Sequence, residues 1–122
     1  MKSSKFSFRD RVRSFQHAFN GFRQLFYEEH NARIHSIAAI IVVCAAIYFD
    51  ISMYEWLAVL FAIGLVFITE ILNTSIENLG DFITTDKIAA MKKIKDLSAA
   101  AVLTSVIVAI VTGLIVFLPK LM

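Results

Sequence analysis

Residues 57–81 read LAVLFAIGLVFITEILNTSIENLGD, a run apolar enough to cross a bilayer except for a stripe of ionisable and amide side chains. The stripe consists of Glu70, Asn73, Glu77 and Asp81, whose spacing returns them to one face of a helix at every turn. A carboxylate in hydrocarbon costs about 3 kcal/mol or more, so this face is not expected to contact lipid. A polar seam between helices would explain a single carboxylate. Three carboxylates and an amide in register favour a functional site.

The composition is that of a small membrane protein. The chain has 122 residues, of which 58% are hydrophobic, and its mean hydropathy of +0.71 is high for a soluble domain of this size. We therefore expect an all-α membrane protein with a single domain, residues 1–122, in which an amphipathic surface helix precedes three transmembrane helices. The surface helix is predicted at 1–30, and the spans at 32–50, 53–82 and 95–119.

The segment before the first span has an amphipathic pattern. Phenylalanine and valine recur at alternating four- and three-residue steps, and charged and amide side chains occupy much of the remaining circumference. Such a helix suits the membrane interface, with its rings in the acyl region. It is interpreted as a membrane anchor, and its closeness to the carboxylate helix adds a second interpretation, a lid over a lipid substrate. The apolar stripe consists of Phe8, Val12, Phe15, Phe19, Phe22 and Phe26.

The basic residues predict the orientation in the membrane. Every Lys and Arg except Lys120 lies before the first span or between the second and the third. By the positive-inside rule that side, with the N-terminus, faces the cytoplasm. The formal net charge of +2 is then concentrated against anionic lipid of the inner leaflet, so no nucleic-acid partner is needed to explain it.

The depth of the stripe suggests its chemistry. Along a helix that begins near Glu55, Glu70 lies about 22 Å and Glu77 about 33 Å away, so the stripe reaches the inner membrane surface. Glu29 and the pair Lys95-Asp96 arrive at the same level from other segments. Hard oxygen ligands, a lysine and a proton-accepting carboxylate together suit Mg²⁺–phosphate chemistry. This spacing alone does not distinguish a kinase from a proton or ion pathway.

The competing interpretation is a non-enzymatic oligomer that relays protons or conducts cations. It requires polar groups through the outer half of the bilayer, whereas residues 56–68 are apolar apart from Gly64. A polar site at half depth suits a lipid-modifying enzyme better. Neither a G-x-x-x-x-G-K-[ST] loop nor an H-R-D catalytic loop occurs, which excludes the conventional soluble kinases. The histidines show no metal-ligand spacing and are interpreted as interfacial polar residues: His17, His30 and His35.

Two motifs carry a resemblance to a known family. The run EILNTSIE at 70–77, followed by Asp81 and by KDLSAAAVL at 95–103, resembles the signature of the bacterial integral-membrane diacylglycerol kinases and undecaprenol kinases. The resemblance extends over nearly the whole chain. Further matching stretches are Ala18 to Gly21, Glu29 to Arg33 and Glu55-Trp56.

This resemblance implies a homotrimer in the bacterial cytoplasmic membrane, with active sites at subunit interfaces that transfer the γ-phosphoryl group of Mg·ATP to a lipid hydroxyl. Carried over by position, Glu70 is the general base and Asn73 orients the reacting groups. The implied Mg²⁺ ligands are Glu29 and Glu77. The implied nucleotide contacts are His17, Glu29, Glu77, Asp86, Lys87, Lys95 and Asp96. The implied lipid contacts are Glu70, Arg33 and Ala99.

The chain departs from the family pattern at two places. It has Ile88-Ala89-Ala90 where many members have a His followed by Pro or Glu, and it lacks a glycine after Lys95-Asp96. For the lipid, undecaprenol and diacylglycerol both remain open, because apolar lining residues discriminate weakly between hydrocarbon chains. The stretches Arg33-Ile34-His35 and Phe117-Leu118-Pro119-Lys120 resemble the undecaprenol kinases and favour that substrate.

Overall fold

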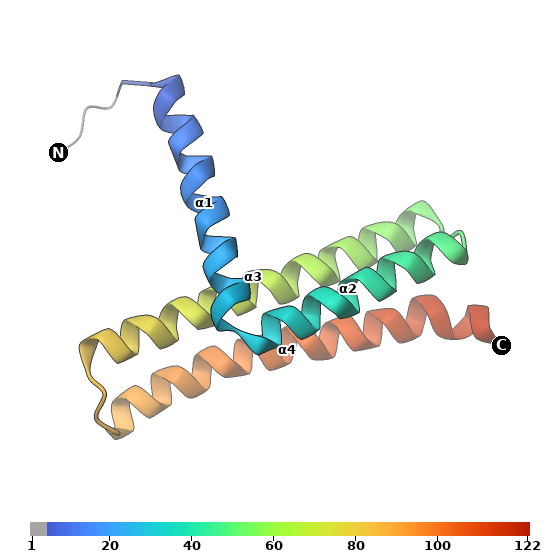
Figure 1. Cartoon of the computed structure of the whole chain (residues 1–122). Helices are drawn as coiled ribbons and strands as arrows, with labels where there is room; N and C mark the ends of the chain where they lie inside the picture. Colours follow the sequence, from blue (N-terminus) through green and yellow to red (C-terminus); the bar gives the residue numbers. More distant parts are fainter. Residues whose placement is uncertain (1–4) are drawn as a thin grey trace.

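The protein is all-helical over the part of the chain that its computed structural model describes, residues 5–122 (Figure 1). Three of the helices are long and apolar enough to cross a membrane. The prediction of an all-α membrane protein is confirmed. The helices are α1 (Phe8–Glu28), α2 (His30–Tyr48), α3 (Met53–Ile83) and α4 (Ala89–Leu121).

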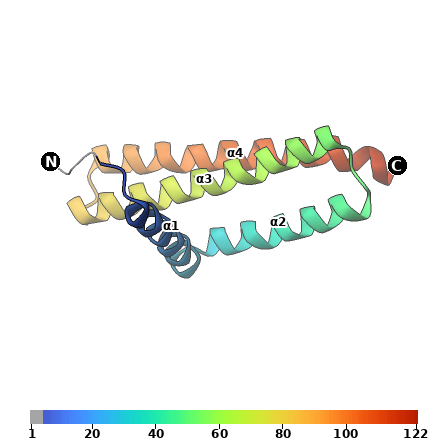
Figure 2. The same cartoon turned by 90° about the horizontal axis from the view of Figure 1, so that it is seen from above.

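The three long helices form an elongated bundle in which α3 and α4 are the most closely packed pair (Figure 1). Figure 2 shows α2 to one side of this pair, with α1 leaving the bundle at a steep angle. Two ends of the bundle can be distinguished. We call the end with residues 84–88 between α3 and α4 the loop end, and the end with residues 49–52 between α2 and α3 the turn end.

An apolar core joins the three long helices at the turn end. Phe49 and Phe117 bring the ends of α2 and α4 together, with ring centroids 6.3 Å apart. Between α2 and α3 the chain reverses through Asp50, whose φ of 51° lies in the left-handed region that a short polar side chain tolerates. The bundle is therefore sealed by hydrocarbon at this end. The buried members of the core are Ala46, Ile51, Val59 and Val116.

The start of α3 is fixed by a reciprocal cap. The Ser52 hydroxyl accepts a hydrogen bond from the Glu55 backbone N–H (3.2 Å), and the Glu55 carboxylate accepts one from the Ser52 backbone N–H (3.0 Å). The second carboxylate oxygen of Glu55 lies 3.1 Å from Nζ of Lys120, near the end of α4. Polar groups at the turn end thus close the helix termini rather than form a pocket.

Two of the helices, α1 and α4, differ from a simple spanning helix. In α1 the phenylalanine stripe is exposed along the chain and only Leu25 is buried, which leaves an apolar face for the membrane surface. The predicted segment 1–30 also includes residues 1–4, which lie outside the described part. α4 begins at Ala89, ahead of the predicted span 95–119, and its first turns carry an ion pair between Lys92 and Asp96.

Replacing Ser52 by Ala removes the acceptor for the first turn of α3 and is expected to lower the free energy of unfolding by about 1 kcal/mol. Denaturant titration of the purified protein in detergent measures this change. Thr104→Ala is the matched control, because the Thr104 hydroxyl bonds only the Ala100 carbonyl of its own helix on an exposed face. Equal stability of Ser52→Ala and the wild type would contradict the capping role.

Candidate functional site

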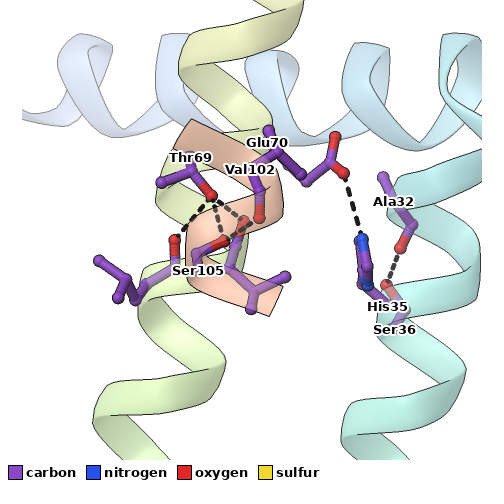
Figure 3. Close-up of polar contacts among 9 residues, drawn as sticks. Ala32, His35, Ser36, Thr69, Glu70, Val102 and Ser105 are labelled. Atoms are coloured by element: carbon purple, nitrogen blue, oxygen red, sulfur yellow. Dashed lines mark hydrogen bonds and ion pairs between the residues drawn. The ribbon is translucent and has the colours of Figure 1, made fainter. Parts of the chain in front are cut away.

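Glu70 is the most deeply buried carboxylate of the stripe, with 1% of its surface exposed. Figure 3 shows its carboxylate directed toward His35 of α2, whose Nε2 lies 3.2 Å from Oε1. This distance suits an ion pair, although the contact lacks the geometry of a hydrogen bond. On the other side, the preceding residue Thr69 forms a 2.8 Å hydrogen bond with Ser105 of α4. Both neighbouring helices therefore hold this turn of α3 through polar contacts.

His35 is a site residue that sequence reasoning interprets only as an interfacial polar group. It is half-buried and provides the polar partner that a carboxylate among apolar helices needs. The available signal is its position, since it lies inside the apolar segment 34–49, whose other ionisable residues are Cys44 and Tyr48. The pairing of α2 with α3 is required to connect that histidine with Glu70.

Asn73 lies one turn nearer the loop end and faces α4. Its Oδ1 accepts a 2.7 Å hydrogen bond from the hydroxyl of Ser98, which is buried. Because the carbonyl oxygen is used in this way, the Nδ2 group remains as a donor for a ligand. The structure thus orients Asn73 as a hydrogen-bond donor beside the buried carboxylate.

The remaining two residues of the stripe meet a lysine from α4. Nζ of Lys95 lies 3.6 Å from Glu77 and 2.5 Å from Asp81. Gly80 permits this approach, because a Cβ there would lie 2.8 Å from the sulfur of Met91 and 3.0 Å from Cε of Lys95. The stripe therefore divides into a buried half at Glu70 and a charged half at the loop end.

A groove of about 740 Å³ lies around the charged half and the 84–88 loop. It brings together several residues that the sequence predicts as nucleotide contacts. Helix α3 supplies carboxylates to the groove, and the loop and α4 supply both carboxylates and lysines. Such a mixture can hold a ligand that carries phosphates and a divalent cation. The ionisable residues in its lining are Glu77, Asp81, Asp86, Lys87, Lys92, Lys95 and Asp96.

Other predicted site residues lie outside this groove. His17 on α1 and Ala99 on α4 are exposed, and neither lines it. Glu29 is half-buried at the junction between α1 and α2, where its backbone N–H donates to the Leu25 carbonyl at 2.9 Å. Within residues 5–122 no three His, Cys, Asp or Glu side chains form a group that could hold a metal. Glu29 also lies outside the lining of the groove that contains Glu77.

Arg33, predicted to contact the lipid, joins α1 to α2. Its Nε and Nη2 donate hydrogen bonds of 2.7 Å to the backbone carbonyls of Phe26 and Tyr27 respectively. These carbonyls belong to the last turn of α1, where no helical N–H is available for them. The planar guanidinium thus determines how α1 leaves the bundle.

An apolar groove of about 260 Å³ opens between α2, α3 and α4 in the hydrocarbon part of the bundle. His35 is its one ionisable lining residue, so the groove continues from the Glu70 site toward the turn end. Small side chains from α2 and α4, Ala38, Ala39, Ala109 and Gly113, keep it open. Its shape and lining suit part of a hydrocarbon chain.

Comparison with known proteins places these features in a family. Residues 16–117 match the family model described as prokaryotic diacylglycerol kinase. The chain is 36% identical over 109 residues to undecaprenol kinase of Bacillus subtilis, covering 89% of each protein. It is 32% identical over 110 residues to a diacylglycerol kinase of Synechocystis, covering 89% of this chain and 63% of that protein. With diacylglycerol kinase of Escherichia coli K12 it shares 29% identity over 101 residues, or 83% of each.

Arg33→Lys keeps the positive charge but loses the planar guanidinium that donates to the Phe26 and Tyr27 carbonyls together. We expect the backbone amides in the last turn of α1 to exchange hydrogen about tenfold faster, as the loss of a charged hydrogen bond predicts. Hydrogen exchange followed by mass spectrometry measures this. Arg13→Lys, at an exposed position of α1, serves as control. Unchanged exchange in Arg33→Lys would mean that α1 is held by other contacts.

Proposed function

The chain belongs to the prokaryotic diacylglycerol kinase family, and on that premise we propose that it transfers the γ-phosphoryl group of ATP to the hydroxyl group of a membrane lipid. Its relatives are named undecaprenol kinase and diacylglycerol kinase, which are lipid kinases. The observation that carries the proposal is the carboxylate of Glu70, buried at a depth where a lipid headgroup can meet a water-soluble reagent. The basic residues support an orientation with the loop end and the N-terminus at the cytoplasmic face of the inner membrane.

In the proposed reaction Glu70 takes the proton of the lipid hydroxyl. The freed oxygen forms a bond with the γ-phosphorus, the bond from that phosphorus to the β–γ bridging oxygen breaks, and ADP leaves. His35 holds the Glu70 carboxylate from α2, and the Nδ2 group of Asn73 donates toward the reacting oxygens. A positioned base of this kind contributes about 10²- to 10⁴-fold to the rate.

The groove at the loop end is proposed to bind the nucleotide. Glu77 is about 10 Å along α3 from Glu70, a separation that a triphosphate can bridge. Lys95 offsets phosphate charge once it exchanges its carboxylate partners for the nucleotide. Further contacts are proposed for His17, Asp86, Lys87 and Asp96.

Magnesium is proposed to be held by Glu29 and Glu77 together with the phosphates. The oxygen donors present fit this ion, because Mg²⁺ usually takes one or two carboxylates, substrate phosphates and waters rather than a cage of protein ligands. When bound, it neutralises charge on the transferring phosphates. Since Glu29 lies outside the lining of the groove that contains Glu77, we propose a homotrimer in which neighbouring subunits complete each site.

Undecaprenol is the acceptor that we propose in preference to diacylglycerol, with undecaprenyl phosphate as product. The higher identity to the Bacillus relative supports this choice. The apolar groove beyond His35 takes the chain segment next to the headgroup. Ala99 and Arg33 are proposed as further lipid contacts, Arg33 through its hold on α1.

Glu70→Gln is expected to lower kcat for lipid phosphorylation by about 10²- to 10⁴-fold, since the amide cannot accept the proton, and to leave ATP affinity unchanged. Glu77→Gln is expected instead to raise the Mg²⁺ concentration needed for half-maximal rate. Steady-state kinetics in mixed micelles at varied ATP and Mg²⁺ separate these effects. Glu55→Gln, a carboxylate at the turn end of the same helix, is the control and retains activity. Equal loss of nucleotide affinity in both site variants would contradict this division of roles.

His35→Ala is expected to lower kcat by about 10- to 100-fold, because a displaced base loses its alignment. The KM for ATP should not change, since His35 lies away from the loop-end groove. His35→Gln restores a polar partner for Glu70 and should recover part of kcat. The kinetics of the two variants measure this, and a kcat of His35→Ala equal to that of the wild type would show that Glu70 is positioned without His35.

A further inference from the structure

Thr74 is unusual among the hydroxyl residues of the described helices. Ser36, Thr69, Ser75 and Thr104, for example, each donate to a carbonyl of the preceding turn, at 2.8–3.0 Å. Thr74 makes no such bond. It is 8% exposed, and its Oγ1 is buried without any hydrogen-bond partner in the described chain.

One other buried side-chain atom of the described residues lacks such a partner, and it is Oε1 of Glu70. The two residues are one helical turn apart on the same face of α3, with a rise of about 6 Å between them. Buried polar groups are almost always satisfied, so the unpartnered Thr74 hydroxyl, beside a Glu70 oxygen whose contact within the described chain is the one with His35, indicates a ligand that contacts both. A lipid headgroup is large enough to contact both residues at once.

Thr74 also lines a cleft of about 340 Å³ between α1 and α3. On the α1 side the wall is low, because Ala18 and Gly21 stand there and a Cβ on Gly21 would meet nothing within 4 Å. The other polar groups in its α3 wall already have partners, since Ser75 bonds the Ile71 carbonyl and Asn78 donates to Glu28 at 3.4 Å. Thr74 is thus the buried group in this wall that has hydrogen-bonding capacity to spare.

We propose that the Thr74 hydroxyl donates a hydrogen bond to a headgroup oxygen of the acceptor lipid and so positions the lipid hydroxyl at Glu70. This deepens the proposed kinase function and rests on it. The oxygen is either the reacting hydroxyl itself, present in both a polyprenol and a diacylglycerol, or an ester carbonyl, present in the diacylglycerol. Thr74 is a positioning residue, and its bond explains why an unsatisfied hydroxyl stands at this position in the ligand-free chain.

The test compares Thr74→Val, which keeps the shape and removes the hydroxyl, with Thr74→Ser, which keeps the hydroxyl. Dioctanoylglycerol and a short-chain polyprenol are the acceptors, and KM for each, KM for ATP and kcat are measured. Without its hydrogen bond, Thr74→Val is expected to have an acceptor KM about tenfold higher. KM for ATP should be unchanged, and Thr74→Ser should recover the acceptor KM. Thr104→Val is the matched control, since that hydroxyl is satisfied within its own exposed helix face.

A rise in KM for both acceptors assigns the bond to the reacting hydroxyl, whereas a rise for dioctanoylglycerol alone assigns it to an ester carbonyl. An unchanged acceptor KM in Thr74→Val, or a rise that Thr74→Ser does not reverse, overturns the proposal.

Thermal unfolding with and without each acceptor separates binding from transfer. Thr74→Val should keep or raise the Tm of the ligand-free protein and lose the upward shift that the acceptor causes. If the wild type phosphorylates neither acceptor, the proposed kinase function is overturned. Loss of the acceptor-induced rise in Tm in Thr74→Val would still support a lipid-binding role for Thr74.

Discussion

The burial of the Glu70 carboxylate is the constraint on which the rest of the structure depends. An ionisable group inside an apolar bundle is tolerated only where polar partners surround it, and the neighbouring helices supply them. α2 brings His35 to within 3.2 Å of the carboxylate, and α4 ties the adjoining turns of α3 through the hydrogen bonds of Ser105 and Ser98. A purely structural helix pair gains nothing from this arrangement, because apolar side chains of similar size would pack without the desolvation cost. The arrangement therefore favours the proposed function over a purely structural role.

Apart from the Ser52–Glu55 cap and its contact with Lys120, apolar and polar interactions are divided between the two ends of the bundle. The turn end is closed by hydrocarbon around Ala46 and Val59, while the described ion pairs of α3 with Lys95 gather at the loop end. This division produces a site at half depth, open to one face of the membrane, and it favours a lipid-modifying enzyme over a proton relay or cation pathway. α1 completes the arrangement, because Arg33 holds its last turn at the level of the site. Its exposed phenylalanines then present an apolar face to the membrane surface.

Much of this architecture can be predicted from sequence because it follows from local periodicity. The apolar spans, the phenylalanine stripe and the register of Glu70, Asn73, Glu77 and Asp81 are all repeats along one helix. The contacts of His35 and Arg33 cannot be predicted in this way, because they depend on how α2 meets α3 and α1. The unpartnered hydroxyl of Thr74 cannot be predicted either, because a threonine in a helix normally bonds its own backbone, and this exception is a property of the three-dimensional structure. The early start of α4 at Ala89 reflects charged residues that extend a helix beyond the bilayer.

The most direct test of the account is the transfer of labelled γ-phosphate from Mg·ATP by the purified protein in mixed micelles that contain undecaprenol and diacylglycerol side by side. Chromatography of the lipids then shows which of them carries the label. The account predicts label in undecaprenyl phosphate, with ADP formed in equal amount. Label in neither lipid, from a folded oligomer with magnesium present, would contradict it and return the buried carboxylate to a structural or proton-relay role.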